Sequence, residues 1–214
     1  MTSVKAEAEY EAKASYDRQQ ATEYEKIRFS GPLGRYRWRV EQTAVAELVG
    51  RIPRGSSVLD CPCGIGRWWP LLLTRAGQLT AMDISPDMLE VAAQRPEALA
   101  GTVKLVAGDA EAIPLEDGSV DYVFSHALTK HLPWPVQYAV FREFGRDARK
   151  GVICSFSVVT PWRYQIWRRR KPAGSYPVLE EELEGLAQHA RLRVVTMRHC
   201  TTPIGVERTV LFER

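Results

Sequence analysis

The sequence has no apolar run long enough to cross a bilayer as a helix, so membrane-spanning proteins are not among the classes that we consider. Residues 1–7 include charged side chains and lack the apolar core of a signal peptide. We therefore expect a cytoplasmic protein. Its 214 residues, 45% of them hydrophobic, are enough to bury a substantial core in one domain.

Cysteine is scarce, and four cysteines in a chain of this length do not make a disulfide framework. Reduced thiols are expected. Cys61 and Cys63 could supply half of a metal site, but His199 and Cys200 are adjacent and fall in a different predicted strand, so we expect no metal. The formal net charge of +3 is too small to favour nucleic acid as a partner.

Residues 57–67 have the pattern of a strand, a glycine turn and a helix start. The apolar strand ends at Asp60, and Gly64 and Gly66 then let the chain turn sharply and let a ligand approach the backbone N–H groups. A dinucleotide fingerprint would have its third glycine at Trp69, where an indole ring obstructs close helix–strand packing. The Asp60 carboxylate would repel a pyrophosphate and attract a cation. The loop therefore favours a cationic nucleoside.

The segment from Asp60 to Gly66 resembles motif I of the class I S-adenosylmethionine-dependent methyltransferases, which has an acid, a spacer and Gly-x-Gly. The spacer with Pro-Cys-Gly is similar to that of small, single-domain, type-11-like members, and the similarity extends from about Tyr16 to the C-terminus. The resemblance implies S-adenosylmethionine as cofactor and S-adenosylhomocysteine as product. It also implies an α/β fold with a doubly wound, mostly parallel seven-stranded sheet, helices on both faces and a C-terminal antiparallel hairpin.

A second acid ends the next predicted strand, at residues 78–83. Asp83 at its tip follows the glycine loop by about twenty residues, the spacing at which an acid meets ribose hydroxyls. Ser85 would cap the following helix, so that Ile84 and Met88 could flank an adenine ring. We therefore expect Asp83 to bind the ribose.

A third acid follows the predicted strand at residues 102–107. In the family that the chain resembles, a Gly-Asp-Ala-Glu pattern like that from Gly108 to Glu111 brings an acid to the exocyclic amine of adenine and a backbone N–H to a ring nitrogen. Asp109 suits this role because a carboxylate accepts from an NH₂ group. The resemblance thus implies that Gly108, Asp109 and Ala110 hold the adenine.

The segment after the fourth predicted strand, residues 120–125, is where we expect the chemistry. Ligands of open α/β sheets bind beyond the carboxyl ends of strands, so the residues from Ser125 onward would face the methionine part of the cofactor and the acceptor. His126 could take a proton from an acceptor hydroxyl or amine, and His131 is a second candidate that could instead pack locally. No Asn/Asp-Pro-Pro-Tyr/Phe sequence follows the strand, which argues against methylases that clamp planar amides or adenine N6.

Near the N-terminus, Tyr16, Tyr24 and Arg28 recur at near-helical spacing. The resemblance implies a leading helix that closes over the cofactor, with Arg28 at the methionine carboxylate. The alternative is a solvated helix with its tyrosines packed on the core. Residues 31–34 would break this helix, and a scaffold helix would run from residue 35 to residue 49.

The full set of cofactor-binding residues that we expect is Tyr16, Tyr24, Arg28, Asp60, Cys61, Gly64, Gly66, Arg67, Asp83, Ile84, Met88, Gly108, Asp109, Ala110 and Ser125.

Aromatic and basic residues are interleaved from Pro161 to Pro172, after the fifth predicted strand. This stretch could cover an acceptor pocket, grip a phosphate or rest on an anionic membrane surface. The alternative is a solvated basic helix whose Trp and Ile side chains pack down on the protein. We expect a small-molecule acceptor, anionic or amphiphilic in character, with peripheral membrane contact permitted and no nucleic acid.

The leading interpretation is one methyltransferase domain over residues 1–214, with a helical cap (1–50), a cofactor-binding core (51–158) and an acceptor side with the terminal hairpin (159–214). The methyl would pass directly to a small-molecule or lipid-like acceptor, and alignment of nucleophile, methyl and sulfur would carry most of the barrier reduction. Two alternatives stay open. One is a catalytically silent binding module with this fold; the other is an NAD(P)-dependent oxidoreductase, which the charge and bulk around the glycine loop disfavour.

Overall fold

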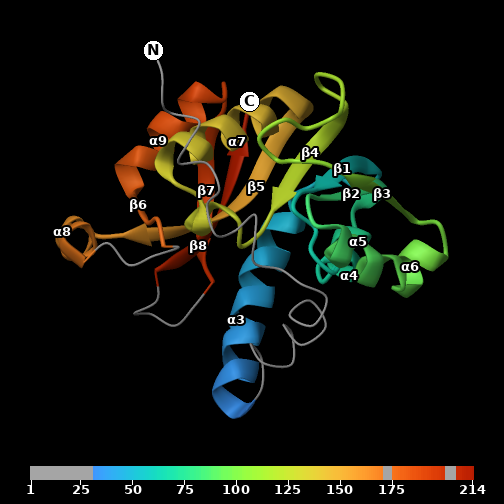
Figure 1. The fold of residues 1–214 in the computed structure, drawn as a ribbon, viewed down its shortest axis with the longest axis horizontal. Coiled ribbons are helices and arrows are strands. Elements are labelled where there is room, and N and C mark those ends of the chain that lie inside the picture. Colours follow the sequence, from blue (N-terminus) through green and yellow to red (C-terminus); the bar gives the residue numbers. More distant parts are fainter. Residues whose placement is uncertain (1–30, 171–174, 201–205) are drawn as a thin grey trace.

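A mixed β-sheet forms the centre of the molecule (Figure 1), and the computed structural model describes residues 31–170, 175–200 and 206–214. The strands are β1 (Ser56–Asp60), β2 (Ala76–Asp83), β3 (Val103–Ala107), β4 (Val120–Ser125), β5 (Ala148–Val159), β6 (Val178–Leu179), β7 (Arg193–His199) and β8 (Glu207–Glu213). The helices are α3 (Gly31–Val49), α4 (Trp69–Leu72), α5 (Pro86–Ala93), α6 (Pro96–Leu99), the 3₁₀ turn η1 (Thr129–His131), α7 (Trp134–Asp147), α8 (Pro161–Arg170) and α9 (Glu180–His189).

The strand order is β3-β2-β1-β4-β5-β8-β7, with the short β6 paired to β5 off this path. Strands β1 to β5 pair in parallel, whereas β8 lies antiparallel between β5 and β7. The chain therefore has the expected doubly wound sheet and the expected terminal hairpin, and β6 is an addition to the seven strands. The order reverses between β1 and β4, so the carboxyl ends of these strands flank the crevice where ligands of such sheets bind.

Two apolar layers cover the two faces of the sheet. One contains Phe141 and Phe144 of α7 and Leu183 of α9, and the other contains Leu48 of α3 and Trp69 of α4. Because both faces are covered, the central strands read as nearly continuous apolar runs. Within the described residues, no helix is both long and apolar enough to cross a membrane.

Helix α3 begins at Gly31, so the expectation that residues 31–34 form a break before a helix at residue 35 is wrong. Pro32 stands in the first turn of the helix, where its missing N–H has no intrahelical acceptor to lose and its fixed φ suits the helix. Figure 1 shows α3 descending from the sheet on the side of the carboxyl ends of β1 and β4.

Helix α4, which follows the glycine loop, has only four residues. Strand β2 already begins at Ala76, earlier than the expected strand start at residue 78. Gly77 lies within β2, where a Cβ would stand 2.9 Å from the carbonyl oxygen of Gly55. The strand can continue through this position because glycine lets the two backbones approach closely.

Candidate functional site

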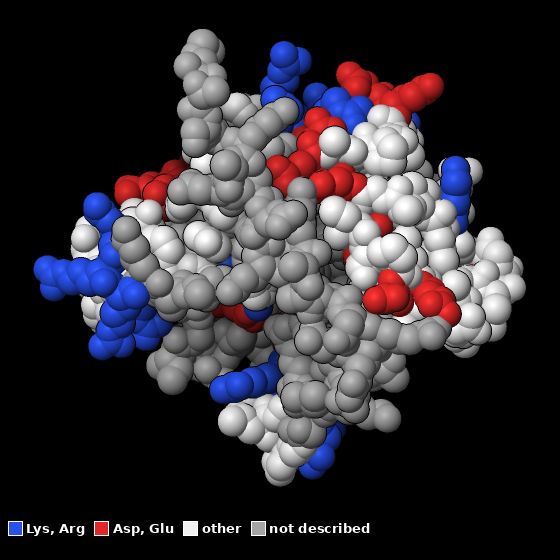
Figure 2. Space-filling model, in the orientation of Figure 1, with Lys and Arg blue, Asp and Glu red and all other residues white. Residues whose placement is uncertain are grey.

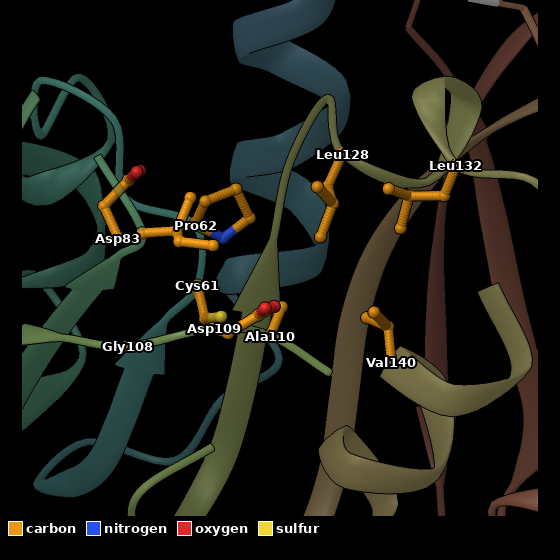
Figure 3. Close-up of a pocket in the computed structure, with 10 residues that line it drawn as sticks. Cys61, Pro62, Asp83, Gly108, Asp109, Ala110, Leu128, Leu132 and Val140 are labelled. Carbon is orange, nitrogen blue, oxygen red and sulfur yellow. The ribbon is translucent and has the colours of Figure 1, made fainter. Parts of the chain in front are cut away.

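A pocket opens beyond the carboxyl ends of β1, β2 and β3, beside the segment that follows β4 (Figure 3). Its polar side carries the carboxylates of Asp83 and Asp109, and its apolar side carries Leu128, Leu132 and Val140. The residues that line it are Cys61, Pro62, Asp83, Ile84, Gly108, Asp109, Ala110, Leu128, Leu132 and Val140.

Asp83 joins the end of β2 to the glycine loop. Its Oδ2 accepts a hydrogen bond from the backbone N–H of Gly64 at 2.8 Å, and its Oδ1 accepts from that of Ser85 at 2.9 Å. Burial raises the pKa of Asp83, while these backbone hydrogen bonds oppose the rise by favouring the charged form. Each carboxylate oxygen has a second lone pair, so Asp83 can hold the loop and still accept from two ligand hydroxyls.

Glycine is required at the two positions of the loop for different structural reasons. Both adopt left-handed backbone angles, with φ of 51° at Gly64 and 76° at Gly66. A Cβ at Gly66 would stand 2.6 Å from ring atoms of Trp69, whereas a Cβ at Gly64 would meet no atom within 4 Å. Gly66 therefore makes room for the protein's own indole ring, and Gly64 leaves open space beside Asp83 that a ligand can enter.

Asp60 does not face the pocket. Its side chain lies beneath the loop with 1% exposure, and its Oδ2 accepts from the indole Nε1 of Trp69 at 3.1 Å. Burial raises the pKa of Asp60 well above its ordinary value, and the Trp69 hydrogen bond only partly offsets this. The sequence predicts that Asp60 attracts a cationic ligand group and that Trp69 obstructs close helix–strand packing. In the structure the two side chains are instead hydrogen-bonded to each other and support the loop from below.

The segment that follows β3 approaches the pocket through its backbone. A Cβ at Gly108 would stand 2.6 Å from Met82 Sδ and 2.9 Å from Pro114 Cδ, so no side chain fits there. The Asp109 carboxylate accepts from the Glu111 N–H at 3.0 Å and lines the pocket. The flanking Ile84, which also lines the pocket, is 43% exposed, and that exposure leaves an apolar surface available to a flat ring.

A buried ionic cluster joins α3, the glycine loop and the end of β4. The guanidinium of Arg67 lies 4.8 Å from the ring centre of Trp38 and 4.9 Å from that of Trp68. Its Nη2 is 3.5 Å from His126 Nδ1, and its Nη1 is 3.9 Å from Glu41 Oε2. These short separations put a cation, a carboxylate and an imidazole in one site.

Each ring nitrogen of His126 faces a charged side chain within this cluster. Its Nε2 lies 3.4 Å from Glu41 Oε1, and its Nδ1 faces Arg67 at 3.5 Å. A guanidinium can only donate, so a hydrogen bond between these two groups has Nδ1 as its acceptor, and Nε2 faces the Glu41 carboxylate. A proton from a ligand could reach Nδ1 only after Arg67 moves away. Neither His126 nor Arg67 is among the residues that line the pocket.

Other residues expected at the site lie elsewhere in the structure. Met88 is 7% exposed and Ser125 is fully buried, and neither lines the pocket. The backbone N–H of His131 in η1 donates to the Leu128 carbonyl at 2.9 Å. Tyr16, Tyr24 and Arg28 lie outside the described residues.

The pocket also contains four residues that we did not predict, namely Pro62, Leu128, Leu132 and Val140. Leu128 and Leu132 lie in the segment after β4, which was expected to face the ligand, but only its polar side chains were considered. Pro62 lies inside the motif itself, next to the predicted Cys61, and a cis peptide bond joins the two. Val140 comes from the middle of α7, and no local pattern in the sequence marks it.

Comparison with known proteins agrees with this geometry. Residues 58–151 match the family model described as a methyltransferase domain. The demethylmenaquinone methyltransferase of Staphylococcus aureus (strain JH9) is 41% identical over 110 residues, which make up 48% of this chain and 44% of that protein. The chain thus spans less than half the length of this curated relative.

Solved structures share the fold at low sequence identity. Magnesium protoporphyrin IX methyltransferase from Synechocystis PCC 6803, solved with bound SAH, superposes with a TM-score of 0.73 and 17% identity, covering 95% of this chain and 98% of that one. Geranyl diphosphate methyltransferase, in complex with GPP and sinefungin, gives a TM-score of 0.60 and 16% identity, covering 85% and 78% of the two chains. At these identities the likeness establishes the fold alone.

Proposed function

We propose that the chain transfers a methyl group from S-adenosylmethionine to a small-molecule acceptor, because its fold is that of the class I S-adenosylmethionine-dependent methyltransferases and residues 58–151 match a methyltransferase domain. The observation that carries this proposal is the pocket at the switch point of the sheet, where two carboxylates from successive strand ends stand opposite an apolar wall. When bound there, S-adenosylmethionine supplies an already activated methyl group on its sulfonium.

The residues of the pocket fit this cofactor. In our proposal Asp83 accepts from the two ribose hydroxyls, because both of its oxygens keep a lone pair beyond the bonds to the backbone. Asp109 accepts from the exocyclic amine of adenine, and Ile84 covers a face of the ring. The open space at Gly64 lets the methionine part lie against the loop backbone. Asp60 acts indirectly, by holding Trp69 under that loop.

The protein's contribution to the reaction, as we propose it, is chiefly alignment. Fixing the acceptor in line with the methyl–sulfur bond removes translational and rotational entropy from the barrier, and this effect can be worth several kcal/mol. His126 is the candidate base, with Glu41 orienting its ring through Nε2. Because Arg67 occupies Nδ1, this role requires Arg67 to move when the acceptor binds.

We further propose an acceptor with a substantial apolar part. Leu128, Leu132 and Val140 give the pocket an apolar wall on the side of the post-β4 segment. The names of similar proteins point the same way, since demethylmenaquinone, magnesium protoporphyrin IX and geranyl diphosphate each combine a large apolar group with polar atoms. Such a molecule could rest on this wall while its nucleophile meets the methyl group.

The proposal is tested in two steps with the whole chain. Calorimetry with S-adenosylmethionine and with NADH should show binding of the first and none of the second; the reverse would favour an oxidoreductase. A screen of quinol, porphyrin and prenyl acceptors with methyl-labelled cofactor should then release label to at least one class. Tight cofactor binding with no transfer to any acceptor would favour the silent binding module.

A further inference from the structure

Within residues 31–170, 175–200 and 206–214, the contacts that attach α8 to the rest of the protein involve Tyr164 and Trp167, on one side of the helix. The indole Nε1 of Trp167 donates to the carbonyl oxygen of Ser175 at 2.6 Å, and its ring stacks on Tyr164 with centroids 5.5 Å apart. Tyr176, which contacts Trp167 edge-on at 6.4 Å, donates its backbone N–H to the Lys130 carbonyl at 2.8 Å. The attached side of α8 is therefore linked to the segment after β4.

The opposite side of α8 exposes two large apolar side chains. Trp162 is 61% exposed and Ile166 is 40% exposed. At 100° per residue they lie about 40° apart on the helix, and more than 90° from Trp167 and Tyr164. The guanidinium of Arg163 lies 5.3 Å from the ring centre of Trp162. We call this side, which carries Trp162, Ile166, Arg169 and Arg170, the outward face of α8.

The last turn of α8, which includes the two arginines of the outward face, is strongly basic. Arg168, Arg169 and Arg170 end the helix and are exposed, and in the described part of the chain no carboxylate forms an ion pair with them. Figure 2 shows their region as a blue patch at the edge of the molecule, and Figure 1 places α8 at the far end from β3. A helix C-terminus favours cations only weakly at an exposed site, while three adjacent like charges repel one another. A complementary anionic surface would relieve that repulsion.

We propose that the outward face of α8 docks the protein onto an anionic lipid surface. An indole ring and an aliphatic side chain flanked by arginines match the interfacial zone of a bilayer, where the apolar groups enter the headgroup boundary and the guanidinium groups meet lipid phosphates. A nucleic acid would satisfy the charges but not the exposed Ile166, and the formal net charge of the chain is only +3.

This inference goes beyond the proposed function, because none of the residues that line the pocket belongs to α8. The docking face is nevertheless connected to the pocket. Tyr176 bonds to Lys130, and Lys130 lies between Leu128 and Leu132 of the apolar wall. The segment that anchors α8 thus contacts the same post-β4 segment that supplies the apolar wall.

The test is co-sedimentation with phosphatidylcholine vesicles prepared with and without phosphatidylglycerol. The protein should bind the anionic vesicles, should bind pure phosphatidylcholine much less, and should be released as salt rises, because screening shortens the reach of exposed charges to about 8–10 Å. The R169Q/R170Q variant should lose about fivefold in partitioning for each arginine. W162A/I166A should weaken binding in a manner that salt does not change.

The matched control is R54Q/K104Q, which removes the same amount of positive charge as R169Q/R170Q. Arg54 is exposed in the loop before β1, and Lys104 is exposed on β3, the edge strand at the other end of the sheet from β7. Its vesicle binding should stay close to that of the unaltered protein. Equal loss in both double variants would overturn the proposal, because net charge alone would then explain the binding. Equal sedimentation with neutral and anionic vesicles would also overturn it, as would binding to RNA or acidic peptides through Arg169 and Arg170 without binding to vesicles. Circular dichroism of each variant confirms that it is folded, and no step depends on methyl transfer.

Discussion

Replacing Asp83 by alanine is the most direct single test of whether the pocket binds the cofactor. The substitution removes both acceptors that hold the Gly64 and Ser85 backbone N–H groups, at 2.8 and 2.9 Å, and it removes the proposed acceptor of the ribose hydroxyls. Two consequences follow, one for cofactor affinity and one for folding stability, and each has its own magnitude.

For affinity, hydrogen bonds to a charged group contribute about 1.5–3 kcal/mol, so the dissociation constant for S-adenosylmethionine should rise roughly ten- to a hundredfold. For stability, a buried N–H left without an acceptor costs about 1–3 kcal/mol, and water will satisfy part of this because the site is only partly buried. Binding should also depend on pH. Burial raises the pKa of Asp83, so the affinity of the unaltered protein should fall as the pH drops toward that raised pKa, and Asp83→Ala should abolish this dependence.

The assays are calorimetry with S-adenosylmethionine across pH and denaturant unfolding of the free protein. Asp60→Asn is the matched control: the amide oxygen can still accept from Trp69, and Asp60 does not line the pocket, so the cofactor affinity should stay unchanged. A folded Asp83→Ala protein with an unaltered dissociation constant would refute the assignment. Equal losses of cofactor affinity in Asp83→Ala and Asp60→Asn would show that Asp83 acts by shaping the loop rather than by contacting the cofactor.

Other substitutions test the loop, the base and the core. Gly66→Ala should lower the free energy of unfolding by about 2–3 kcal/mol or more, because its Cβ meets the buried indole at 2.6 Å. Gly64→Ala should lower it by about 1–2 kcal/mol for the left-handed φ alone, and should chiefly weaken cofactor binding. Denaturant unfolding and calorimetry measure the two effects, and equal losses of stability would contradict the distinction. His126→Ala should lower kcat about a hundredfold at unchanged cofactor affinity, and Glu41→Gln should lower it less and shift the pH profile; unaltered turnover would leave alignment as the whole mechanism. Burial raises the pKa of Asp147 from 3.8 to about 7, so its contribution to stability is full below pH 4 and lost as the pH rises toward 7; Asp147→Asn should flatten that part of the thermal-unfolding profile, and an identical profile would disprove the shift.

The order of elements along the chain and the two pocket carboxylates could be predicted from the sequence, because their signals are local. Apolar runs separated by glycine and proline mark the parallel strands, and Ser85 caps α5 as predicted, with its Oγ accepting from the backbone N–H of Met88. Asp83 is the last residue of β2 and Asp109 comes two residues after β3, and a strand end is a position that a local pattern reveals. The match of residues 58–151 to a methyltransferase domain covers this same part of the chain.

The tertiary structure alone decided which residues that are distant in the sequence contact each other. The pattern around Asp60 is the same whether its carboxylate faces a ligand or an indole. The absence of a Cβ at Gly66 leaves room for the Trp69 ring against the loop, where its Nε1 donates to Asp60. Glu41 meets His126 only because α3 packs across the end of β4, and Val140 reaches the pocket only because α7 covers that face of the sheet. Such contacts have no local signal, since burial and hydrogen bonding at each position depend on which remote segment the fold brings against it.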